Sequence, residues 1–176
     1  MRGVTHAAVG ANAVWIPVAL GWVVAPWWVA VAAFVALIPD LDASESTIKN
    51  LSIGSRHMRV KPLAPVALVT GMVFGHRGFL HSAVILVAVS IVIAVLLPTN
   101  TVAWMVVLLA YLSHLLLDAL TKSGIGLLWP LQLRIGLLPR MLRVRTGGLL
   151  DTVLLLLGAA GVVIFLYSFA SIPFEL

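Results

Sequence analysis

Residues 102–120, VAWMVVLLAYLSHLLLDAL, are the clearest indication of the class of fold. The stretch is apolar almost throughout, and its histidine and aspartate, His114 and Asp118, lie near its carboxyl end. A helix that crosses the hydrocarbon core of a bilayer needs about 20 predominantly apolar residues. The stretch therefore predicts a transmembrane helix that carries a histidine and an aspartate toward one membrane face.

The composition of the whole chain indicates the same class. Of its 176 residues, 62% are apolar and 10% are charged, whereas an ordinary soluble domain is about 25% charged. A soluble fold of this size could not cover so much apolar surface, so a soluble globular domain, a disordered chain and a disulfide scaffold are excluded. The chain has no cysteine, which excludes thiolate metal sites and cysteine nucleophiles.

Four further apolar runs are predicted spans: residues 7–24, 26–38, 79–97 and 148–170. The second is short for a bilayer, and the apolar residues 62–75 are too few for a span of about 20 residues. Residues 62–75 are therefore expected to form a re-entrant or interfacial segment. The sequence predicts an all-α polytopic membrane protein, one domain over residues 1–176, with about five transmembrane helices and this short segment.

The positive charges predict the orientation. If residues 62–75 do not cross, all 11 lysines and arginines fall on one side, and the positive-inside rule makes that side cytoplasmic. The amino terminus is then inside, the carboxyl terminus outside, and the location is the inner membrane. The net charge of +5 indicates contact with anionic lipid headgroups rather than nucleic acid. A signal peptide is the alternative for residues 7–24, but only Arg2 precedes them and no convincing cleavage site follows.

The conspicuous polar residues gather at one membrane level. In this topology five separate segments deliver histidine or aspartate to the cytoplasmic ends of the spans. Ionisable groups at this depth are costly, and they are usually paired, metal-bound or in contact with a wet cavity. The residues are His6, Asp40, Asp42, His76, Arg77, His81, Ser82, His114, Asp118, Thr121 and Asp151.

Two spacings permit a shared ion, and each also has a simpler explanation. His114 and Asp118 are four residues apart in a predicted helix and share a face, which Thr121 extends. They can bind one divalent ion, or they can form a pair that supports helix packing. Asp40 and Asp42 follow a proline that breaks the preceding run. Their carboxylates can reach one or two cations, or Asp42 can cap a helix and face solvent.

The densest polar cluster is residues 75–82, GHRGFLHS. Glycines on both sides of His76 and Arg77 permit a tight turn. His76 is expected in this turn, and His81 and Ser82 at the start of the following span. The alternative is an arginine–histidine patch that contacts lipid phosphate. His6, at the start of the first run, is by itself most typical of an interfacial residue.

Taken together, these residues favour a metal site, because separate packing roles would not require five segments to meet at one level. Imidazoles and carboxylates without thiolates suit zinc, manganese or magnesium, and the number of histidines favours zinc. The candidates exceed the ligands of one ion, so two or more ions are expected. Such a site can polarise a phosphoryl oxygen and activate water, and Arg77 can clamp phosphate with two hydrogen bonds.

At these residues the chain resembles the YdjM-like family of membrane-bound, LexA-regulated, predicted metal-dependent hydrolases. The matching stretches are Thr5-His6, residues 38–42, 75–82 and 111–121, then Gly124 and residues 127–130. The chain departs from the family at Ala43, where relatives often have histidine, and at Leu80, where they usually have threonine. More distantly, the histidine and aspartate set is similar to that of zinc-dependent phospholipase C and P1-type nucleases.

The resemblance and the residue pattern together imply a hydrolase that cleaves a phosphoester in a lipid or lipid-linked substrate at the cytoplasmic interface, by metal-activated water. Membrane lipids and this phosphate-containing lipid are the expected partners, and no nucleic acid is expected. The alternatives are a non-catalytic metal-binding membrane protein in a stress response and a metal transporter. Transport is disfavoured because the predicted outer halves of the spans offer almost no polar residues.

The hydrolase interpretation assigns three roles to the polar residues. The expected metal ligands are His6, Asp40, Asp42, His76, His81, His114 and Asp118. The expected catalytic residues are Arg77, Asp118 and Asp42. The expected substrate or supporting contacts are Arg77, Ser82, Thr121 and Asp151.

Overall fold

The computed structural model describes residues 1–42, 79–131 and 133–171. Their secondary structure consists of helices and turns without a β-strand, so the all-α prediction is confirmed for these residues. Two helices, Thr101–Ala119 and Leu149–Ala170, are long and apolar enough to cross a membrane. The described helices do not confirm about five spans, and residues 62–75, the predicted re-entrant or interfacial segment, lie outside the described residues.

The first apolar run forms a broken helix rather than one continuous span. It consists of α1 (Gly3–Ala11), the 3-10 helix η1 (Asn12–Val14) and α2 (Trp15–Ala19). The break has a local cause, because Pro17 has no N–H to donate to the carbonyl four residues earlier. The helix ends before residue 24 because Gly21 has a φ of 83°, a left-handed conformation that terminates helices.

Residues 26–38, predicted as a short span, contain a still shorter helix. α3 (Trp28–Val35) has 8 residues, which correspond to a length of about 12 Å. The hydrocarbon core of a bilayer is about 30 Å thick, so α3 alone does not bridge it. Prolines limit the helix, because Pro26 precedes its first turn and Pro39 lies in the following 3-10 helix η2 (Ile38–Asp42).

The longer helices begin at polar caps or after a turn. α5 (Ala83–Leu96) begins after Ser82, and α6 (Thr101–Ala119) begins after Asn100; both caps accept a hydrogen bond from an N–H of the first turn. α7 (Leu149–Ala170) follows a basic segment of turns that contains the 3-10 helix η3 (Arg140–Leu142). α6 agrees closely with the predicted span at residues 102–120, and α7 agrees with residues 148–170.

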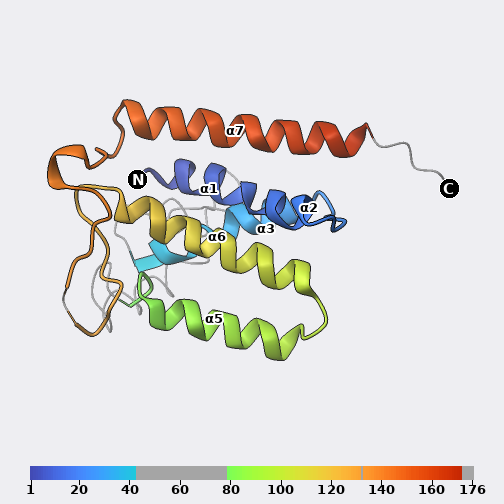
Figure 1. Cartoon of the computed structure of the whole chain (residues 1–176), viewed down its shortest axis with the longest axis horizontal. Coiled ribbons are helices and arrows are strands. Elements are labelled where there is room, and N and C mark those ends of the chain that lie inside the picture. Colours follow the sequence, from blue (N-terminus) through green and yellow to red (C-terminus); the bar gives the residue numbers. More distant parts are fainter. Residues whose placement is uncertain (43–78, 132, 172–176) are drawn as a thin grey trace, which may run out of the picture.

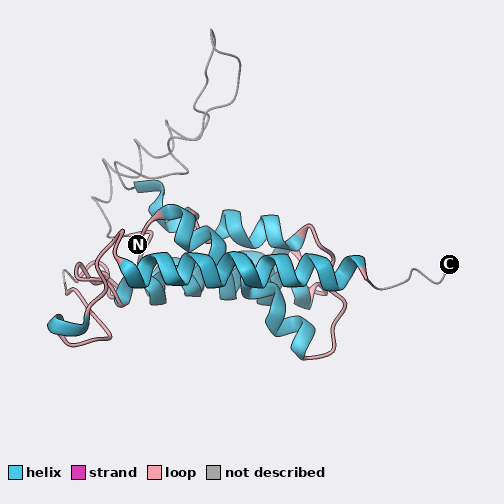
Figure 2. Cartoon of the chain, turned by 90° about the horizontal axis from the view of Figure 1, so that it is seen from above, coloured by secondary structure: helices cyan, strands magenta, loops and turns pink. Residues whose placement is uncertain are grey.

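The helices lie side by side along one main direction (Figure 1). α1 packs against α7, α3 and α6, and α6 also packs against α3 and α5. Figure 2 shows that α7 runs along the length of the bundle. The amino ends of α1, α5 and α7 and the carboxyl ends of α3 and α6 lie at the same end of the bundle, on the left of Figure 1. Residues that are distant in the sequence can therefore meet at that end.

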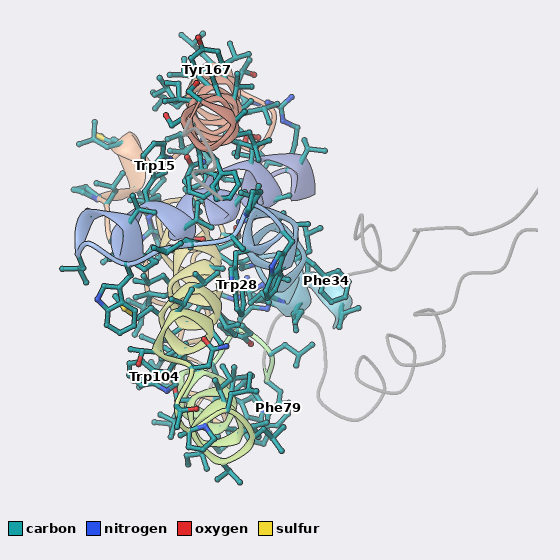
Figure 3. All side chains as sticks on the ribbon, turned by 90° about the vertical axis from the view of Figure 1, so that its right-hand side faces the viewer. Trp15, Trp28, Phe34, Phe79, Trp104 and Tyr167 are labelled. Carbon is teal, nitrogen blue, oxygen red and sulfur yellow. The ribbon has the colours of Figure 1, made fainter. Side chains whose placement is uncertain are left out.

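Apolar side chains fill the interior and also cover the outside. Figure 3 shows Trp28 among the helices and Tyr167 projecting outward from α7. Val95 of α5 is 70% exposed and Leu157 of α7 is 65% exposed, as expected for surfaces in contact with lipid. The interior is formed mainly by α1 to α3 and α6, with Val14, Ala32, Ala36, Val106, Ala110, Tyr111 and Leu115 among its buried residues.

α1 and α7 make a close polar contact within the apolar bundle. Asn12 Nδ2 donates hydrogen bonds to the carbonyls of Ala8 (2.7 Å) and Gly158 (2.8 Å), and Trp15 Nε1 donates to the carbonyl of Gly161 (3.2 Å). A methyl group at Gly158 would lie 2.9 Å from the backbone carbonyl carbon of Ala8. The absence of a side chain therefore allows the two backbones to approach, which is a common basis of helix pairing in membranes.

Candidate metal centre

Four buried side chains from three segments meet at the end of the bundle described above. They are Asp40 of η2, His81 before α5, and His114 and Asp118 of α6, and one ligand atom of each lies within 4.8 Å of the others. All four residues are less than 9% exposed. The predicted convergence of distant segments is thus present for these four candidates.

The local sequence explains how these side chains are placed. His114 and Asp118 are one helical turn apart on α6 and point from the same face. His81 lies in the turn directly before the cap residue Ser82, rather than within the helix. The Ser82 hydroxyl donates to the carbonyl of Phe79 (2.6 Å) and caps α5, so it holds the turn that carries His81.

The distances between the ligand atoms match those of a metal site. His81 Nε2 and His114 Nε2 are 3.2 Å apart. Asp40 Oδ1 is 3.7 Å from the first and 3.8 Å from the second, and Asp118 Oδ2 is 3.6 Å and 3.8 Å from them. Ligands about 2.0–2.1 Å from a tetrahedral ion are about 3.3 Å apart. The four atoms therefore surround a space slightly larger than the one that these bond lengths require, and one divalent ion would fit in it.

Two further observations favour a cation between these atoms. His114 Nδ1 lies 2.7 Å from the carbonyl oxygen of Ala36, and a carbonyl can only accept, so Nδ1 carries the hydrogen. In the neutral ring, Nε2 is then the nitrogen that can bind a cation in the cluster. Asp118 Oδ2 is buried and accepts no hydrogen bond from any residue that the structure describes. A buried carboxylate oxygen without a donor is costly, and a bound cation would satisfy it.

The charge state of Asp40 also suits a metal ligand. Burial would raise the pKa of its carboxyl, but the imidazoles of His81, His114 and His6 favour the charged form and hold this pKa below its ordinary value. Metal binding requires the deprotonated carboxylate, so Asp40 is in the required form at neutral pH.

His6 lies beside the four-residue group. Its Nε2 is 3.1 Å from Asp118 Oδ1, and its ring stacks on that of His114 with centroids 3.8 Å apart. The Met1 nitrogen lies 2.6 Å from the same Asp118 oxygen. Asp118 thus directs one oxygen toward the other three members of the cluster and the other toward α1.

The remaining candidates have other surroundings or lie outside the described residues. Thr121 donates to the carbonyl of Asp118 (2.7 Å) and closes the end of α6. Asp151 Oδ2 accepts hydrogen bonds from Arg2 Nε (3.1 Å) and the Gly147 N–H (2.6 Å), so it ties α7 to α1. His76, Arg77 and the side chain of Asp42 lie outside the described part of the chain.

Tyr111 is a supporting residue that is not among the polar candidates of the sequence. It is fully buried, and its hydroxyl donates to the carbonyl of Leu80, the residue before His81. A signal for it was present, because Tyr111 precedes His114 by three residues and therefore lies on the same face of α6. The tyrosine restrains the backbone that presents His81.

Comparisons with known proteins identify a family for this chain but no related solved structure. A family model described as "YdjM inner membrane protein" matches residues 1–173. The inner membrane protein YdjM of Escherichia coli K12 is 36% identical over 118 residues, which are 61% of this chain and 53% of that protein, and its Shigella flexneri counterpart matches equally. The uncharacterized protein YvsG of Bacillus subtilis 168 is 32% identical over 102 residues, 58% of this chain and 56% of that protein. The chain thus matches about half the length of these curated relatives, and no solved structure matches.

Proposed function

Because the chain belongs to the YdjM inner membrane protein family, we propose that it is a membrane-bound, metal-dependent hydrolase with its site at the cytoplasmic interface. The single observation that carries the proposal is the buried group of Asp40, His81, His114 and Asp118, spaced as the ligands of one divalent ion. Zinc is the proposed ion, because two imidazoles and two carboxylates suit it. Manganese and magnesium are the alternatives.

The proposed substrate is a phosphoester in a lipid or lipid-linked molecule. Zinc held by these residues would supply polarisation of a phosphoryl oxygen and activation of water. Asp40 and Asp118 would offset its charge, and the Ala36 carbonyl would keep the His114 ring in the required orientation. The basic segment between α6 and α7 begins at the same end of the bundle, where it favours anionic headgroups. Arg77 is proposed to hold phosphate, and Asp42 to assist the reaction as a carboxylate.

One observation favours a non-catalytic alternative. Four protein ligands complete a tetrahedral site, as in structural zinc sites, whereas catalytic sites keep a position open for water. On this alternative, the protein is a metal-stabilised membrane protein that acts in a stress response by binding other molecules rather than by catalysis. Transport is less favoured, because the polar side chains of Asn12 and Ser90, farther along the helices, donate hydrogen bonds to backbone carbonyls within the bundle.

The experiment that tests the proposal is a metal-dependent hydrolysis assay. Protein purified in detergent is stripped with a chelator and reloaded with zinc, manganese or magnesium. It is then offered a panel of lipid phosphomonoesters, phosphodiesters and pyrophosphates. We expect hydrolysis only by the reloaded protein, since the ion supplies the activated water. Monoesters and pyrophosphates would release inorganic phosphate, and phosphodiesters would give an alcohol and a phosphomonoester. Stoichiometric metal binding with no turnover on the whole panel would instead support the non-catalytic alternative.

The topology is part of the proposal and has a separate test. We propose multiple crossings of the inner membrane, with the amino terminus inside and the carboxyl terminus outside; α6 and α7 have the length and hydropathy for two of them. The chain lacks cysteine, so His57→Cys introduces a single label site in the basic stretch. A membrane-impermeant reagent should label it only after the cytoplasmic side is opened. Labelling by the reagent from the outside alone would contradict the proposed orientation.

A further inference from the structure

The two carboxylate oxygens of Asp118 have different surroundings. Oδ2 lies 3.6 Å from His81 Nε2 and 3.8 Å from His114 Nε2, in the four-residue cluster. Oδ1 lies 3.1 Å from His6 Nε2 and 2.6 Å from the Met1 nitrogen. A carboxylate placed in this way can serve two positions at once, because each oxygen has two lone pairs.

His6 is buried without the hydrogen bonds that an ordinary buried histidine makes. Its side chain is 0% exposed, and neither ring nitrogen forms a hydrogen bond with any residue that the structure describes. The 3.1 Å contact with Asp118 Oδ1 is short enough for a hydrogen bond but lacks the required geometry. Stacking on His114 at 3.8 Å holds the ring against the cluster. Since a buried polar group without a partner is costly, the arrangement calls for a partner beside His6.

We propose that a second divalent ion binds between His6 Nε2 and Asp118 Oδ1, so that the Asp118 carboxylate bridges two ions. The 3.1 Å separation of these atoms agrees with about 2.9–3.4 Å for two ligands of one ion with bonds of about 2.0–2.1 Å. Hydrolytic two-metal sites hold their ions about 3.5–4 Å apart, a spacing that a bridging carboxylate provides.

The inference rests on the proposed function and answers its main difficulty. The first cluster has enough protein ligands to close a tetrahedral site, so it leaves little room for substrate. The second position has two ligands among the described residues, His6 and Asp118, and the Met1 nitrogen lies 2.6 Å from the same Asp118 oxygen. In this proposal water and a phosphoryl oxygen would complete the coordination of the second ion. Two ions on adjacent sites can stabilise both the attacking and the leaving oxygen of a phosphoester. The second ion therefore gives His6 the ligand role that the sequence predicts, and it identifies the ion that His6 would bind.

The test is the metal content and magnetic coupling of the full-length protein in detergent. Wild type loaded with zinc should hold about two ions per chain, as in other two-metal hydrolytic sites. His6→Gln provides a polar side chain of similar length but removes the imidazole ligand, so this variant should hold about one ion. Asp40→Ala should also lose only one ion, whereas Asp118→Ala should lose both, because only Asp118 is shared. Ser113→Ala is the matched control, since the Ser113 hydroxyl bonds to the carbonyl of Ala110 on its own helix, and it should match wild type.

Manganese-loaded wild type provides a readout that needs no variant. Two manganese ions that share a carboxylate are magnetically coupled, so their electron paramagnetic resonance signal should differ from that of an isolated ion, and His6→Gln should restore the isolated signal. One uncoupled ion in wild type would overturn the inference even if His6→Gln failed to fold. Wild-type metal content and coupling in His6→Gln would also overturn it and leave His6 as an orienting neighbour. Two coupled ions without phosphoester turnover would contradict the hydrolase proposal alone, and turnover with one ion would contradict the second site alone.

Discussion

Replacement of both His114 and Asp118 by alanine is expected to abolish tight divalent-metal binding. The two residues provide half of the four-residue group, and His114 Nε2 lies within 3.8 Å of the ligand atoms of each of the other three. Loss of a group that only supports a ligand typically costs about 10–100-fold in metal affinity, so loss of two direct ligands should cost more. Metal content after dialysis against a weak chelator, measured by elemental analysis, checks this expectation.

The double variant needs a control for folding, because both side chains are buried. Ser113→Ala is on the same helix, and its hydroxyl bonds within α6, so its metal content should equal that of wild type. Helicity measured by circular dichroism separates loss of metal from loss of structure. Asp118→Asn offers a second, nearly isosteric variant that removes the charge and should also bind metal weakly. Full metal content in the folded double variant would rule out the assigned ligands.

The second large effect concerns Arg77, which follows His76 and lies four residues before His81 in the sequence. Arg77→Lys keeps the positive charge but loses the planar fork that binds phosphate through two hydrogen bonds. If Arg77 clamps phosphate, turnover of a phosphoester should fall on the order of 10²-fold, the typical effect of losing a donor to a developing oxyanion. Metal content should stay at the wild-type level, because arginine is not a ligand.

The alternative role of Arg77 predicts a different result. An arginine that only contacts lipid headgroups needs a long side chain with a cationic end, and lysine provides this equally. Arg59→Lys, in the basic stretch upstream, is a matched control in which turnover should be unchanged. Wild-type turnover by Arg77→Lys, on a substrate that the native protein hydrolyses, would reject the clamp and support the lipid-contact role.

The sequence was most informative where one helix carries the pattern. The spacing of His114 and Asp118 on an apolar helix predicts a shared face, and α6 has both side chains buried in the cluster. Asp40 and His81 were also predicted ligands, and both are in the group. His6 was also predicted as a ligand; it lies beside the four and contacts Asp118 and His114. Periodicity indicates which face of its own helix a residue occupies. It does not indicate which side chains from other helices that residue meets.

The sequence was less informative about the lengths of the first two helical segments, which are shorter than the predicted spans. Hydropathy alone treats residues 7–24 and 26–38 as continuous runs, but Pro17, Gly21 and Pro39 act on the backbone independently of hydropathy. The result is the broken helix of α1, η1 and α2, and an α3 of only 8 residues. Asp40 reaches the cluster because α3 ends early and η2 turns the chain toward α6.

Composition and spacing act locally, and they were enough to predict the helical class, the two long apolar helices and the residue types of the cluster. Which polar residues meet depends on how the helices pack. The Asn12 and Gly158 contact places α1 on α7, the Ala36 carbonyl orients His114, and Tyr111 holds the turn before His81. The packing also separates Asp151, which pairs with Arg2, from the four-residue cluster. These choices depend on packing between distant helices, where a shift of one turn, about 5.4 Å, would separate ligand atoms that now lie within 4.8 Å of one another.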